Sequence, residues 1–288
     1  MYAGLPIALA LIKQGKSVHL ANWRFAELYD PGSWVAPGVA AVRADTVGND
    51  DYFPERTLAR WLAAHDLDQP VYTFAPTGVR PLRAAYNALA ERLDLDAVVL
   101  VDGGTDIWLR GDEAGLGTPL EDITSLAALA HLDAIPTRLV TSLGFGIDAH
   151  HGVNHTDVLQ NLHALTAAGS YLGAFSIPAD SNEAAAYLDA VQHARTSTPG
   201  RPSIVNGQIA AALHGSAIDD DLARRTSGSE LFINPLMTIY FAADLDGLAA
   251  ANLYLDTLAD TDTTREVALA LEAYRYDATV RPPVPFPH

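Results

Sequence analysis

The sequence contains no cysteine, which excludes a disulfide framework, a thiolate nucleophile and any metal or iron–sulfur site with cysteine ligands. Lysine occurs only at Lys13 and Lys16, so arginine carries almost all of the positive charge. No apolar run approaches the roughly 20 residues that a membrane-spanning helix requires, and the first residues lack a signal-peptide pattern. We therefore expect a cytoplasmic protein that does not enter a membrane.

Positive charge is scarce throughout the chain. The 35 acidic residues outnumber the 18 basic ones, which gives a formal net charge of -17. Nucleic acid and anionic membrane surfaces would be repelled by this charge, so we expect neither as a partner. The excess of acidic residues favours a small-molecule ligand that is neutral, cationic or bridged by a metal ion. Acidic residues on the surface also increase solubility.

The alternation of short apolar runs with amphipathic segments predicts the fold class. With 288 residues, 49% of them hydrophobic, the chain can bury a substantial core. We expect α/β architecture, with a three-layer, doubly wound, mostly parallel sheet (Rossmann-like), in a single domain over 1–288. A C-terminal helical pair at about 245–275 and a Pro-rich tail complete the domain.

Periodicity and turn residues place the individual elements. The expected strands are 17–21, 71–74, 97–101, 137–143, 171–177 and 202–206. The expected helices are 5–12, 54–65, 80–93, 121–131, 156–168, 183–195, 208–214, 245–258 and 264–274. The segment 22–49 has the composition of a loop, either a functional lid or a surface loop packed by its own aromatic residues.

An acidic loop follows the apolar run at 97–101. It begins Asp102-Gly103-Gly104-Thr105-Asp106 and continues to Asp112 and Glu113. Ligands in α/β sheets sit beyond the carboxyl ends of such strands, and helix capping would use one of these acids rather than four. We therefore expect Asp102 and Asp106 to be catalytic, with capping plus solvation as the structural alternative.

A second loop with ionisable residues follows the expected strand 137–143. It carries Asp148, His150, His151 and His155. If the two strands are neighbours, both loops open on one crevice. Asp148, His150 and His151 are then candidates for acid–base catalysis. The structural alternative is that backbone groups satisfy these polar side chains.

A divalent metal ion is the candidate cofactor, since imidazole and carboxylate groups suit zinc, manganese or iron. The candidate metal ligands are Asp106, Asp148, His151 and His155. The candidate substrate-binding residues are Gly103, Gly104, Thr105, Arg110, Asp112, Glu113, Asn206, Glu230 and Asn234. The chain contains no P-loop, no G-x-G-x-x-G and no G-x-S-x-G motif.

Four segments together resemble the uncharacterised family called DUF1152. They read VLVDGGTDIWLRGDEAGLGTPLEDITSLAAL, LGFGIDAHHGVNH, PSIVN and GSELFINPLM. The resemblance implies a Rossmann-like α/β domain of unknown biochemical role and carries no established catalytic residue. Members usually open with a strand and a Gly-rich loop before the helix that here is 5–12, so the resemblance also implies a late start or a truncation.

These observations lead us to expect an enzyme that acts on a small polar metabolite by acid–base chemistry, as a hydrolase or lyase with or without metal assistance. The alternative is a non-catalytic ligand-binding or sensing module for a nucleotide or sugar-like metabolite. A third hypothesis is a degenerate relative that persists as a homo-oligomer, with the apolar first helix and the Pro-rich tail as interface elements.

Overall fold

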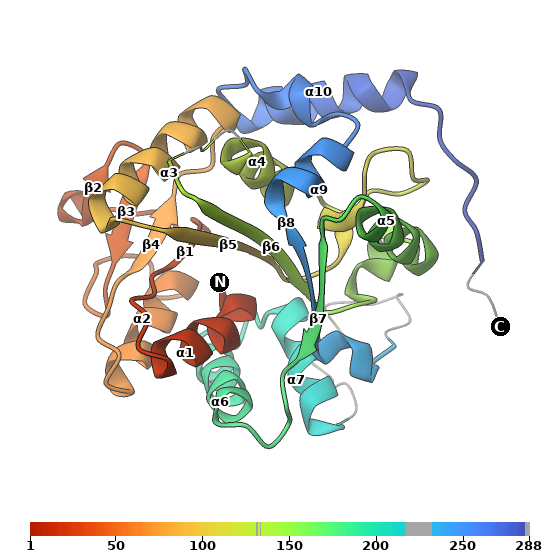
Figure 1. The fold of residues 1–288 in the computed structure, drawn as a ribbon. Coiled ribbons are helices and arrows are strands. Elements are labelled where there is room, and N and C mark those ends of the chain that lie inside the picture. Colours follow the sequence, from red (N-terminus) through yellow and green to blue (C-terminus); the bar gives the residue numbers. More distant parts are fainter. Residues whose placement is uncertain (131, 133, 217–231, 286–288) are drawn as a thin grey trace. The chain divides into compact units, whose positions relative to one another are not determined.

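A computed structural model describes residues 1–130, 132, 134–216 and 232–285. The chain forms two compact units, and Figure 1 labels their helices and strands. Unit 1 comprises Met1–Ala75 with Ile177–Gly228, and unit 2 comprises Pro76–Ser176 with Ser229–His288. Each unit combines helices with one four-stranded sheet, which confirms the α/β class. The expectation of a single domain stays a prediction.

Unit 1 is built on a sheet with the strand order β1-β4-β3-β2. Its strands are β1 (Leu20–Trp23), β2 (Trp34–Ala36), β3 (Val39–Val42) and β4 (Val71–Phe74). Its helices are α1 (Leu5–Lys13), α2 (Pro54–Ala64), α6 (Asn182–Ser197) and α7 (Ile204–His214). All four side chains of β4 are buried, and a hydrogen bond of 2.7 Å from Trp61 Nε1 to Asp189 Oδ2 joins α2 to α6.

Unit 2 is built on a sheet with the strand order β5-β6-β8-β7. Its strands are β5 (Ala97–Asp102), β6 (Thr137–Leu143), β7 (Tyr171–Ser176) and β8 (Ile239–Asp244). Its helices are α3 (Val79–Leu93), α4 (Leu120–Leu129), α5 (His155–Ala167), α9 (Leu245–Ala251) and α10 (Thr264–Asp277). Helix α4 contacts β5 and also α3, α9 and α10, so its buried apolar face forms part of the core beside β5.

The prediction of one mostly parallel sheet is wrong. Only β1–β4 and β5–β6 pair in parallel, whereas the other four strand pairs of the described residues are antiparallel. The segment 22–49, which was expected to be a loop, contains β2 and β3. These two strands are too short to give a clear periodic signal. Strand β8, which was not predicted, lies between β6 and β7 and makes two of the antiparallel pairs.

Two further predictions of secondary structure are corrected. Residues 202–206 do not form a strand, because α7 begins at Ile204 and the Ser203 side chain caps it by accepting the N–H of Asn206. The helix expected at 245–258 is divided: α9 ends at Ala251, and a short 3₁₀ helix, Leu255–Leu258, follows. Within the part of the chain that the structure describes, no helix has the length and apolar character needed to cross a membrane.

Candidate functional site: an aspartate group at the edge of the unit 2 sheet

The two ionisable loops meet because their strands are adjacent. Strands β5 and β6 pair in parallel, and the last pair in their register is Asp102 with Ser142. Both loops therefore leave the sheet at the same edge. A hydrogen bond of 2.6 Å from the Thr105 N–H to Asp148 Oδ2 joins them directly.

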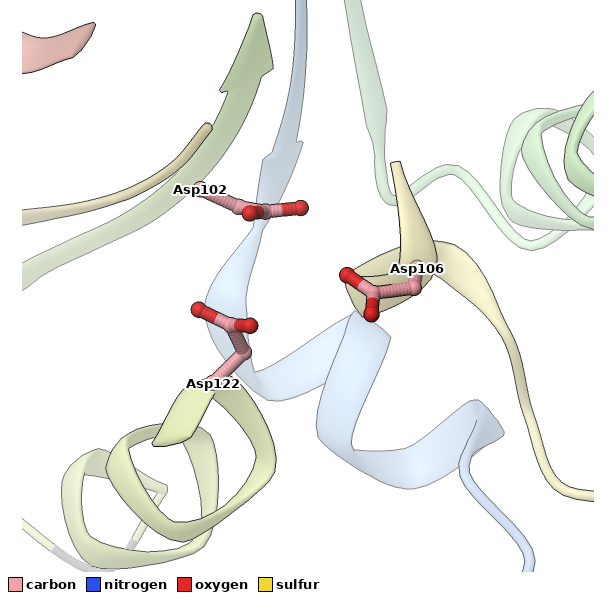
Figure 2. A group of neighbouring side chains, drawn as sticks. All are labelled: Asp102, Asp106 and Asp122. Atoms are coloured by element: carbon pink, nitrogen blue, oxygen red, sulfur yellow. The ribbon is translucent and has the colours of Figure 1, made fainter. Parts of the chain in front are cut away.

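Three aspartates from three different elements converge at this edge. Asp102 ends β5, Asp106 begins a 3₁₀ turn (Asp106–Trp108), and Asp122 lies in the first turn of α4. Each offers a carboxylate oxygen, and the three oxygens lie within 4.8 Å of one another. Figure 2 shows the three side chains pointing toward a common space. With Asp148, which binds Thr105, they form what we call the aspartate group.

Two glycines make this close approach feasible. A Cβ atom on Gly117, whose φ is +68°, would lie 2.4 Å from Asp106 Oδ2. A Cβ atom on Gly104 would lie 2.6 Å from Asp148 Oδ2. Both distances are far below van der Waals contact, so the loops hold these carboxylates only if both positions lack a side chain. Gly103, also expected at the site, lies in the same turn after β5.

The aspartate group is buried and lacks a basic partner. Asp102, Asp106 and Asp148 are 5%, 4% and 6% exposed, and Asp122 is half-buried. Across the described ranges, no arginine or lysine forms an ion pair with any of the four. Asp106 accepts the Thr118 N–H at 2.8 Å, but Asp102 Oδ2 is buried without a hydrogen-bond partner.

Burial raises the pKa of every carboxyl in the group. Repulsion from Asp148 adds to burial and raises the pKa of Asp106 to about 7. Burial, followed by repulsion from Asp122 and Asp106, raises the pKa of Asp102 well above its usual range. The pKa of Asp122 is raised in the same way by burial and then by Asp106, and burial also raises that of Asp148. Such a group binds protons or a cation, because it cannot carry its full negative charge uncompensated.

The three histidines of the second loop are not among the residues whose ligand atoms converge with those of Asp102, Asp106 and Asp122. His150 Nδ1 lies 2.7 Å from the Ile147 carbonyl oxygen, and its ring lies against that of His151, with centroids 3.8 Å apart. His151 is exposed; burial and His150 lower its pKa, while its neighbour Asp106 acts to raise it. His155 packs against Phe145, and burial lowers its pKa.

The expected metal set of Asp106, Asp148, His151 and His155 is therefore not the one whose ligand atoms converge. Among the described residues, the converging set is Asp102, Asp106 and Asp122. Sequence reasoning missed Asp122, because acids in the first turn of a helix are common and favourable there. The available signal was its position in the helix that follows the acidic loop.

Glu113 belongs to a separate, satisfied network. Its carboxylate is fully buried and accepts the N–H groups of Arg110 and Gly111, the Asn161 amide at 2.6 Å and Arg281 Nη2 at 2.7 Å. Burial acts to raise the pKa of Glu113, but the hydrogen bonds from Asn161, Arg110 and Gly111 lower it on balance. This arrangement indicates a structural role.

The remaining predicted substrate-binding residues also have local partners or lie elsewhere. Asp112 is within 3.4 Å of Arg110 and 3.6 Å of Arg281. Asn234 caps a 3₁₀ turn by accepting the Leu236 N–H. Asn206 belongs to unit 1, where it bonds Ser203 and accepts the Tyr187 hydroxyl. Glu230 lies outside the described residues.

Comparison with known proteins identifies a family whose function is unknown. The model of the family described as "Protein of unknown function (DUF1152)" matches residues 26–276. No curated protein and no solved structure matches the chain. The matched range contains the whole aspartate group, and the family description assigns it no role.

The raised pKa values predict how stability varies with pH. In the presence of a chelator, the folded protein binds more protons than the unfolded chain between the unfolded pKa of Asp106, 3.8, and its folded value of about 7. This contribution to stability is complete below the unfolded pKa and is lost as pH rises through the folded one. We expect the melting temperature to rise by several degrees from about pH 8 to about pH 6. Asp106→Asn should flatten this rise and stabilise the protein at the higher pH.

The control for the pH measurement is Asp256→Asn, at an exposed position of unit 2. It should keep the wild-type slope. Parallel curves for the wild type and Asp106→Asn would contradict the assignment of the raised pKa to Asp106.

The Glu113 network predicts the opposite response to removal of an acid. Glu113→Ala should destabilise the protein by about 3–5 kcal/mol, because it leaves Arg281 and three N–H donors without their buried partner. Urea denaturation measures this loss. Glu272→Ala, at an exposed position of α10, serves as the control and should stay within about 0.5 kcal/mol of the wild type. An equally small effect of Glu113→Ala would show that its network is not structural.

Proposed function

We propose that this protein, which belongs to the DUF1152 family, is an enzyme that transforms a small polar metabolite by acid–base chemistry at the aspartate group. One observation carries the proposal: four mostly buried carboxyl groups share one sheet edge without an ion pair to arginine or lysine among the described residues. Such a group destabilises the folded chain, whereas Glu113 shows how the same loop satisfies an acid structurally. A destabilising cluster at a strand end is typical of a functional site.

The surrounding residues provide groups for proton transfer. Asp148 is held in place by the Thr105 N–H, and the exposed His151 interacts electrostatically with Asp106. Imidazole and carboxyl groups in such positions act as general acids and bases in hydrolysis and elimination. We assign proton transfer to Asp148 and His151, and substrate positioning to Asp102, Asp106 and Asp122.

Three broader expectations stay proposals beside this one. They are the Rossmann-like layering, a homo-oligomeric assembly and a cytoplasmic location. An experimental structure, light scattering and imaging of the tagged protein in its source cells would test them in turn.

The test of the enzymatic proposal starts from a thermal-shift screen of small polar metabolites. A metabolite that raises the melting temperature is then incubated with the protein and followed by mass spectrometry. We expect the wild type to convert it, and Asp148→Asn and His151→Ala to lower the rate by about 100-fold or more with melting temperatures within a few degrees of the wild type.

The exposed variant Asp256→Asn should convert the metabolite at the wild-type rate. A stabilising metabolite that returns unchanged after long incubation would overturn the enzymatic proposal in favour of a ligand-binding or sensing module. Undiminished turnover by Asp148→Asn and His151→Ala would overturn the assigned roles.

A further inference from the structure

We infer that Asp102, Asp106 and Asp122 form a binding site for one hard divalent cation, Mg²⁺ or Mn²⁺, which bridges the protein to a phosphate or carboxylate group of its metabolite. The inference deepens the proposed function, because the cation and the metabolite would occupy the same sheet edge. It replaces the aspartate–histidine metal set expected from the sequence.

The geometry suits a small cation with oxygen ligands. The three carboxylate oxygens lie within 4.8 Å of one another and come from a strand end, a 3₁₀ turn and a helix start (Figure 2). Oxygens on opposite sides of Mg²⁺ lie about 4.2 Å apart, and those around Ca²⁺ lie slightly farther apart. Separations of up to 4.8 Å slightly exceed the span around Mg²⁺, so small side-chain movements would bring the three oxygens around one ion.

An independent observation is the unpartnered oxygen of Asp102. Asp102 is 5% exposed, and its Oδ2 atom has no hydrogen-bond partner among the described residues. The Ile107 N–H acts on the Asp102 carboxyl and opposes the rise of its pKa, while Thr105 donates to Asp148 and Thr118 donates to Asp106. A buried carboxylate oxygen without a partner costs free energy, and a metal ion satisfies it.

The ligand set selects the class of metal. All three converging ligands are carboxylates, whereas the nearby His151 ring is exposed and outside the converging set. Carboxylate oxygens favour Mg²⁺, Ca²⁺ and Mn²⁺ over zinc, copper or iron, which favour imidazole and thiolate. A site of carboxylates alone therefore points to a hard ion.

The coordination that Mg²⁺ prefers points to the metabolite class. Asp122 is half-buried, whereas Asp102 and Asp106 are almost fully buried. Mg²⁺ bound by few carboxylates keeps positions for water and for substrate oxygens. An ion here would let a protein with a net charge of -17 bind an anionic metabolite that its own field would otherwise repel.

Mn²⁺ is the probe for the test, because its electron paramagnetic resonance signal reports free ion directly. Full-length protein stripped with a chelator is titrated with Mn²⁺ and, in parallel, with Mg²⁺ in a thermal-shift assay. We expect one Mn²⁺ per chain and a melting temperature raised by both ions. Asp102→Asn and Asp122→Asn should each weaken Mn²⁺ affinity by about tenfold or more.

The same variants provide a check on folding. With chelator present, both should melt at or above the wild-type temperature, because each removes a repelling charge. Asp256→Asn should bind Mn²⁺ as the wild type does. Absence of Mn²⁺ binding at millimolar concentration would overturn the cation site, and so would equal binding by Asp256→Asn and both site variants. Bound protons would then be what neutralises the aspartate group.

The outcomes separate this inference from the proposed function. Turnover in chelator by a protein that binds no Mn²⁺ would overturn the cation site and leave the enzyme intact. Stoichiometric Mn²⁺ binding that is lost in Asp122→Asn, together with a metabolite that returns unchanged, would support the cation site and overturn the enzyme.

Discussion

Repulsion among the carboxyl groups at the edge of β5 and β6 is the constraint around which the site is built. The chain tolerates it by directing backbone N–H groups at Asp102, Asp106 and Asp148, and by placing glycine where a side chain would strike the oxygens of Asp106 and Asp148. These devices position the carboxylates but do not neutralise them. A proton or a metal ion can balance the remaining negative charge. This edge of the sheet can therefore bind either one.

The acidic loop divides into two parts with different physical roles. Glu113 and Asp112 lie near Arg281, and Glu113 accepts four hydrogen bonds, so this part connects the loop to the segment after α10. Asp102 and Asp106, which precede them in the same loop, form no ion pair with arginine or lysine among the residues that the structure describes. Acids with a basic partner hold the loop in place, whereas the ligand site that we propose uses acids without one.

The local sequence predicted those features that depend on near neighbours. The apolar runs of β5 and β6 and the acids that follow them were recognisable, because a buried strand must be apolar and must end in residues that leave the sheet. The short strands β2 and β3 were missed, since three or four residues carry little periodicity. Strand β8 was missed because no turn signal separates its apolar run from the helix that follows at Leu245.

The sequence by itself determined the α/β class, the positions of β5 and β6, and the presence of Asp102, Asp106 and Asp148 in the loops after them. Tertiary structure alone decided that Asp122 joins these acids, that His155 does not, and that β8 pairs antiparallel beside β6. It also decided which acids are neutralised, because Arg281 lies 168 residues beyond Glu113 in the chain. A carboxylate responds to every charge within a few ångströms, and those charges come from segments that only folding brings together.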